Sequence, residues 1–82
     1  MKTLNDLAVG QTCVVTKISE KCRLLSRFTD IGLIEGTVVE CVGKSPAGNP
    51  KAYLIRGAVI AIRNEDCSEV FIEFGVKAYG VN

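Results

Sequence analysis

The chain contains no histidine and no tryptophan, and its other aromatic side chains are three phenylalanines and two tyrosines. Without histidine, Ser–His and Cys–His nucleophilic pairs and zinc sites with histidine ligands are excluded. Acid–base chemistry at neutral pH would fall to carboxylates, lysines or cysteines. Because aromatic residues are so few, Val, Ile, Leu and Ala must fill the core, and this composition is typical of β-rich domains.

Neither sign of charge is in excess, because ten basic residues stand against nine acidic ones and no segment carries a run of like charge. A nucleic-acid-binding protein normally needs a basic surface that neutralises phosphates, so this class is disfavoured. No run approaches the roughly 18 apolar residues of a membrane-spanning helix. Asn5 and Asp6 stand where a signal peptide would need apolar residues. We expect a cytoplasmic protein that does not insert into a membrane.

The four cysteines form no Cys-x-x-Cys pair; they are Cys13, Cys22, Cys41 and Cys67. Without a secretory context we expect them to be reduced and buried as small apolar residues. A site made only of thiolates would require the four to converge in space, which the spacing does not indicate. The alternative that they serve a small thiol-based metal carrier remains open at this point.

One segment, residues 19–36, has the apolar period of a helix, and β-rich sequence lies on both sides of it. Ser19 is a candidate N-cap, and Gly32 suits the left-handed position that ends many helices. Between them we expect a helix of about three turns. The residues on its apolar stripe are Leu24, Leu25, Phe28 and Ile31.

The rest of the chain predicts a small all-β framework. We expect a single helical turn after Thr3, with Asp6 at the capping-box position, and a tight turn near residues 64–67. The expected strands are Thr12–Ile18, Thr37–Gly43, Ala52–Arg56, Ala58–Arg63 and Glu69–Phe74. Between the second and third lies a turn-rich loop that contains Gly48, Asn49 and Pro50.

At 82 residues the chain is one domain that buries only about 60 to 65% of its unfolded surface. Five short strands cannot bury both faces of an open sheet in so small a chain, whereas closing the sheet gives each strand an inside face. We therefore predict a mainly β fold: a small, partly closed, SH3-like β-barrel of about five strands with one or two short helices. The barrel is expected over residues 1–75, followed by a C-terminal tail over 76–82.

Two groups of charged residues are candidates for binding. Arg23 and Arg27 lie one helical turn apart and could meet an acidic partner or form a solvated face. Phe28 on the same helix is expected in the core, although a helix that lies across a small barrel often leaves an apolar rim exposed. A second group of carboxylates could bind a divalent metal weakly or form a solvated turn and strand face. Its members are Glu65, Asp66, Glu69 and Glu73.

In order and spacing, the motifs resemble the FeoA family, small bacterial ferrous iron transport proteins. The resemblance runs from Leu4 to Ile72 and rests on four features. They are a Leu-x-x-Leu start that ends at Gly10, the helix that leads into Gly32-Leu33 and Gly36-Thr37, the Gly48-Asn49-Pro50 loop, and Ala61-Ile62-Arg63 followed by Asp66. The chain departs from the family pattern at Glu35, Asn49 and Cys67, where proline, aspartate and alanine are common.

The resemblance implies an SH3-like barrel that is an accessory to FeoB, the membrane permease that imports Fe²⁺ and carries a cytoplasmic GTP-binding part. It implies an interaction module that is not an enzyme and has no cofactor. Carried onto this chain, the partner-binding surface comprises the helix and the loop. Its expected residues are Arg23, Arg27, Phe28, Gly48, Asn49 and Pro50.

Two further readings stay open beside this one. The same fold occurs as the C-terminal module of iron-dependent repressors, although a free-standing chain without a helix-turn-helix argues against that role. A nucleic-acid-binding barrel would need basic and aromatic residues on one face, and only Tyr53 and Phe71 are plausible stacking groups.

Overall fold

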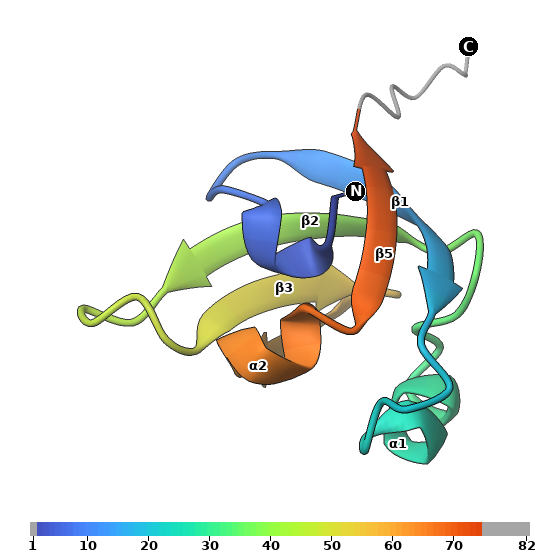
Figure 1. Cartoon of the computed structure of the whole chain (residues 1–82). Coiled ribbons are helices and arrows are strands. Elements are labelled where there is room, and N and C mark those ends of the chain that lie inside the picture. Colours follow the sequence, from blue (N-terminus) through green and yellow to red (C-terminus); the bar gives the residue numbers. More distant parts are fainter. Residues whose placement is uncertain (1, 75–82) are drawn as a thin grey trace, which may run out of the picture.

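The structure is a computed structural model that describes residues 2–74 (Figure 1). Eight short elements follow one another along the chain. They are η1 (Leu4–Asp6), β1 (Thr12–Ile18), α1 (Leu25–Asp30), β2 (Val38–Lys44), β3 (Lys51–Ile55), β4 (Ala58–Ile62), α2 (Asn64–Cys67) and β5 (Val70–Phe74). The predicted tail over 76–82, and the boundary that precedes it, lie outside the described residues.

The five strands form one antiparallel sheet in the order β4-β3-β2-β1-β5. In Figure 1 the sheet curls, so that β5 crosses in front of β2, and the short helices η1 and α2 lie beside β2 and β3. Register shifts between Val15 and Lys17 in β1 and between Cys41 and Gly43 in β2 bend these strands. Within the described residues β4 and β5 do not pair with each other. The prediction of a mainly β, partly closed barrel is confirmed.

The inside of the curled sheet is filled by aliphatic residues and thiols, as the composition predicted. Tyr53 of β3 is fully buried at the centre. Its hydroxyl accepts a hydrogen bond from the thiol of Cys67 and donates one to the carbonyl oxygen of Leu4, both over 3.3 Å. A buried tyrosine needs such partners for its polar atom. Three elements, η1, β3 and α2, are thereby joined through one side chain.

The strand predictions are correct to within one residue at each end, and β1 is as predicted. The expected turn after Thr3 is the 3₁₀ helix η1, where a carboxylate oxygen of Asp6 accepts from the N–H of Thr3 over 2.9 Å. The tight turn at residues 64–67 is the short helix α2. No helix among residues 2–74 is long and apolar enough to cross a bilayer.

The prediction of a three-turn helix is wrong in length, because α1 contains only six residues. Before it the chain makes two successive turns, in which Cys22 N–H donates to Ser19 and Leu25 N–H donates to Cys22. These turns carry the thiol of Cys22 into the core, where it is 5% exposed. The hydroxyl of Ser19 does accept from the N–H of Lys21, over 3.1 Å, but it caps a turn and not a helix.

The end of the helix is as predicted. Gly32 has a φ of +88°, a left-handed conformation that suits glycine. Its N–H donates to the carbonyl oxygen of Thr29 over 3.1 Å, and the N–H of Leu33 donates to that of Phe28 over 2.8 Å. This pair of bonds is the Schellman motif, and the buried Leu33 then anchors the exit of the helix in the core.

Candidate functional site

A groove of about 430 Å³ separates the helix α1 from the edge strand β4. One wall comes from α1 and the turn before it, and the other from β4 and the start of α2. The lining residues are Arg23, Leu24, Arg27, Phe28, Ile31, Ile60, Ala61, Ile62, Arg63 and Asp66. Three of the six predicted partner-binding residues, Arg23, Arg27 and Phe28, therefore lie together in this groove.

The floor of the groove is apolar. Phe28 is only 2% exposed, so it anchors α1 in the core and offers little surface to a partner. Leu24 and Ile31, on the same helical stripe, are partly buried against the core, as is Ile60 across the groove. The burial of Phe28 agrees with the expectation that it lies in the core, and Leu24, Ile31 and Ile60 supply the accessible apolar surface of the groove.

Charge at the groove is mostly positive. Arg23 donates to the carboxylate of Asp66 over 3.0 Å. The Asp66 side chain is 6% exposed and that of Arg23 is 65% exposed, so a nearly buried carboxylate is neutralised from the surface. Arg27 and Arg63 are exposed and have no ion-pair partner among residues 2–74. The groove thus has two arginines that remain available to an acidic group.

The predicted loop residues Gly48, Asn49 and Pro50 do not line the groove. The carboxamide oxygen of Asn49 accepts from the N–H of Asn64 over 3.0 Å, and the side chain of Asn64 donates to the carbonyl oxygen of Gly48 over 3.3 Å. The loop therefore caps the first turn of α2. In Figure 1 this loop, between β2 and β3, lies on the opposite side of α2 from α1.

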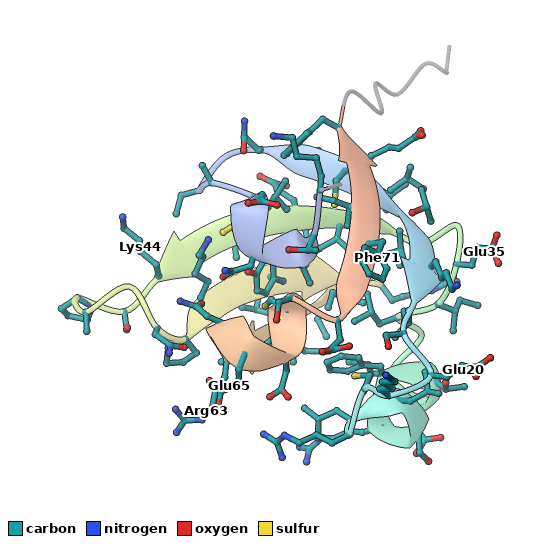
Figure 2. All side chains as sticks on the ribbon, viewed as in Figure 1. Glu20, Glu35, Lys44, Arg63, Glu65 and Phe71 are labelled. Carbon is teal, nitrogen blue, oxygen red and sulfur yellow. The ribbon has the colours of Figure 1, made fainter. Side chains whose placement is uncertain are left out.

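Helix α2 connects the two halves of the predicted surface. At its start Asn64 holds the loop, and one turn later Asp66 holds Arg23. Arg63, immediately before Asn64, points away from the body of the molecule in Figure 2. The two halves are neighbours across α2 and do not form one continuous groove.

Among the described residues, no three Cys, Asp or Glu side chains converge in a way that could hold a metal ion. Asp66, one of the four carboxylates considered as a weak metal site with Glu65, Glu69 and Glu73, pairs instead with Arg23. All four cysteines are buried and free, as predicted. Burial raises the pKa of the Cys13 thiol and that of the Cys67 thiol to about 11, so both stay protonated at neutral pH. This geometry does not supply the site that a thiol-based carrier needs.

A stacking platform for nucleic-acid bases is not assembled either. Tyr53 is fully buried, and burial raises the pKa of its hydroxyl well above its ordinary value. Phe71 lies on β5 (Figure 2), away from the groove. The two aromatic residues proposed for stacking therefore do not share an exposed face.

Sequence reasoning missed the β4 wall of the groove. For the segment that contains Ile60 and Arg63 the sequence predicts a strand and a family motif, and not a binding surface. A signal was present, because residues 58–62 form an apolar run without a charge or a proline, which is unusual for an edge strand. Nothing in the sequence, however, indicated that this strand would be at an edge.

A protein-family model described as the FeoA domain matches residues 2–74. A search of curated proteins found no match. Among solved structures, the FeoA-like protein of Clostridium acetobutylicum superposes with a TM-score of 0.82 at 24% identity, over 94% of this chain and 92% of that one. These matches cover nearly all of the described chain.

Two other solved structures share the fold. The FeoA of Stenotrophomonas maltophilia, solved with zinc and described as a procaryotic SH3 domain protein, has a TM-score of 0.78 at 22% identity, over 89% of this chain and 91% of that one. A manganese-dependent transcriptional repressor has a TM-score of 0.80 at 17% identity, over 90% of this chain but 36% of the repressor. At such identities the likeness establishes the SH3-like fold, as predicted.

Proposed function

Because the chain belongs to the FeoA family, whose domain model matches residues 2–74, we propose that it is a non-enzymatic accessory of bacterial ferrous iron uptake. It binds a FeoB-type Fe²⁺ permease in the cytoplasm, through that protein's GTP-binding part. The observation that carries the proposal is the extent of the family match, which includes every described element.

Three further observations support an interaction role. The S. maltophilia FeoA is described as a candidate ferrous iron transport activating factor. The described lining of the groove contains no serine, threonine, cysteine or lysine, and its carboxylate, Asp66, is paired with Arg23. An apolar groove with exposed arginines is instead suited to bind a protein segment.

The proposed contact surface has two parts. The principal part is the groove, with Arg23 and Arg27 at its rim and Phe28 in its floor. The second part is the loop of Gly48, Asn49 and Pro50, which α2 holds beside it. Arg27 is the most direct contact candidate, because Arg23 is engaged by Asp66.

The test is a ¹H–¹⁵N NMR titration of the labelled protein with the GTP-binding domain of the FeoB from the same genome, with and without nucleotide and Fe²⁺. We expect amide shifts over residues 21–31 and 44–50. Arg27→Glu should weaken the complex by about tenfold or more, since it reverses a charge at the contact. Lys17→Glu makes the same charge change on β1, outside the groove, and should leave the affinity unchanged. An absence of shifts with every form of the domain would contradict the proposal.

A second candidate function is favoured by the likeness to the manganese-dependent repressor. In this reading the chain acts as an SH3-like regulatory module of a metal-dependent repressor. Its test is the affinity of the repressor from the same genome for its operator, measured with and without this protein. A change in operator affinity together with a silent FeoB titration would favour the regulatory role.

A further inference from the structure

The edge strand β4 is chemically unlike most exposed edges. Its sequence, Ala-Val-Ile-Ala-Ile, has no charged residue and no proline, and Val59 is 64% exposed. Ala58 and Ala61 are also exposed. Natural proteins usually protect an exposed edge with charge, proline or a covering segment, because an open edge pairs with other strands. Neither charge nor proline protects β4.

The backbone of β4 presents unpaired groups at this edge. Ile55 and Ala58 pair directly across the two-residue turn of Arg56 and Gly57, which have φ values of +52° and +84°. In such a hairpin the flanking pair is hydrogen-bonded, and bonded pairs then alternate with non-bonded ones. The N–H and C=O groups of Val59 and Ala61 therefore point away from β3.

The other edge of the sheet, β5, is partly paired with the N-terminal segment. The N-terminal segment lies against β5, where Thr3 bridges Phe71 and the N–H of Ile72 donates to the carbonyl oxygen of Lys2 over 3.1 Å. That edge is thus partly covered by the chain itself. Within residues 2–74 no strand pairs with β4 on the side opposite β3.

The groove described above lies beside this open edge. A strand added to β4 would direct alternate side chains to the inner side, where Leu24, Ile31 and Ile60 offer apolar surface. Arg27 and Arg63 also line this groove, and both residues are exposed. Among the described residues that line it, the only carboxylate, Asp66, is already paired with Arg23.

The positive charge at the groove favours an acidic segment over a second copy of this chain. If two copies paired their β4 strands antiparallel about Ile60, Gly57 of each would face Arg63 of the other, and Arg56 would lie next to that Arg63. Such pairing gathers positive charge at both ends of the new ladder, which opposes association. A segment with carboxylates would instead pair with these arginines by charge-assisted hydrogen bonds.

We propose that the β4 edge and its groove bind an extended, acidic segment of a protein partner, which adds to the sheet as a sixth strand. Backbone bonds at Val59 and Ala61 supply affinity, and Arg27 and Arg63 select acidic side chains. The inference rests on the proposed function, because it names the surface and the chemistry of that partner contact.

The first test selects ligands from a random peptide library displayed on phage, with the full chain as bait. We expect enrichment of peptides that alternate aliphatic and acidic residues, and amide shifts centred on residues 58–62. Their affinity should fall as salt is raised. Enrichment of basic peptides, shifts confined to other strands, or no enrichment would overturn the inference.

The second test removes a single outward N–H. Val59→Pro should weaken the binding of the selected peptide by about tenfold or more, because the peptide loses the hydrogen bond from this N–H. The variant should still fold, because a proline at this edge position leaves the ladder to β3 intact. Val59→Thr keeps the N–H and should change the affinity by less than about threefold. Ala61→Pro provides a second probe of the same edge if Val59→Pro does not fold. Equal affinity of both proline variants and the wild-type chain would contradict strand addition.

The third test uses charge and the FeoB domain. Arg63→Glu should weaken the binding of the selected peptide by about tenfold, whereas Lys17→Glu should leave it unchanged.

If the FeoB domain binds the wild-type protein, Val59→Pro and Arg63→Glu equally well, the inference fails and the proposed function stands. If acidic peptides bind at β4 and the FeoB domain does not bind, the inference stands and the proposed function fails. Dimerisation of the wild-type chain that Val59→Pro abolishes would assign the edge to a second copy and overturn the inference.

Discussion

Arg23 and Asp66, 43 residues apart in sequence, form an ion pair of 3.0 Å that joins the turn before α1 to the helix α2. The carboxylate is nearly buried and the guanidinium is mostly exposed. Both residues line the groove, so the pair links the wall that contains α1 to the wall that contains α2. Its contribution to stability comes mainly from satisfying the buried carboxylate, because a surface ion pair by itself contributes little.

We expect Arg23→Ala to lower the free energy of unfolding by about 1 to 2 kcal/mol, because it leaves the Asp66 carboxylate without its partner. Arg27→Ala is the matched control. Arg27 lies one turn further along, is exposed and pairs with no described carboxylate, so its loss should cost less than about 0.5 kcal/mol. Urea denaturation followed by circular dichroism measures both. Equal effects of the two substitutions would show that the ion pair does not stabilise the fold.

Gly32→Ala should destabilise the protein by about 2 kcal/mol. Its φ of +88° disfavours a side chain, and an added Cβ would lie 3.0 Å from the side chain of Arg56. Gly10→Ala is the control, because Gly10 has a φ of +93° but no atom within 4 Å of the added Cβ, so it should cost only about 1 kcal/mol.

A double variant separates the two causes at Gly32. In an Arg56→Ala background the steric part should disappear, and the cost of Gly32→Ala should approach that of Gly10→Ala. Arg56→Ala also removes the hydrogen bond from its Nε to the Gly32 carbonyl oxygen, 3.2 Å long, so its own cost is measured separately. A cost of Gly32→Ala that does not change in this background would place the strain in the backbone alone.

Tyr53→Phe should lower the free energy of unfolding by about 1 to 2 kcal/mol without changing the fold. The substitution removes the hydroxyl that links Cys67 to the carbonyl oxygen of Leu4, and it leaves that carbonyl without this donor. Amide hydrogen exchange should show the largest loss of protection in η1 and α2, the two elements that the hydroxyl joins. Uniform loss over the whole sheet would contradict this local role.

Stability should fall in alkaline solution because of the buried thiols. Burial raises the pKa of both Cys13 and Cys67 from 9.0 to about 11. Below about pH 9 the thiols are protonated in both states, so this contribution is fully present. Between about pH 9 and 11 the unfolded thiols ionise first, so the free energy of unfolding decreases as the pH rises.

The measurement is urea denaturation at about pH 8 and about pH 10 for the wild-type chain and Cys13→Ala. The variant should lose less stability between the two conditions, because one of the shifted thiols is gone. The comparison between the two proteins removes the effect of lysines and other groups that titrate in the same range. A decline of the same size in both would show that Cys13 does not contribute.

Much of the fold follows from local sequence. β1 is a β-branched run, and its bounds are as predicted because alternation and flanking turn residues define a strand without reference to distant residues. The end of α1 was also predictable, since a glycine at the left-handed position depends on the backbone alone. The start of α1 was not, because burial of Cys22 outweighed the helical period of the preceding residues.

Part of the candidate site could also be predicted from the sequence, and part could not. The helical stripe and its two arginines were visible in the sequence, because residues one turn apart share a face. The sequence also determined what the core is made of, as aliphatic side chains and free thiols were the only groups available in quantity. Only the tertiary structure decided that β4 is an edge and that Asp66 meets Arg23. Each of these depends on which distant strands and helices become neighbours when the sheet curls, and that packing is decided by the whole chain together and not by any one segment.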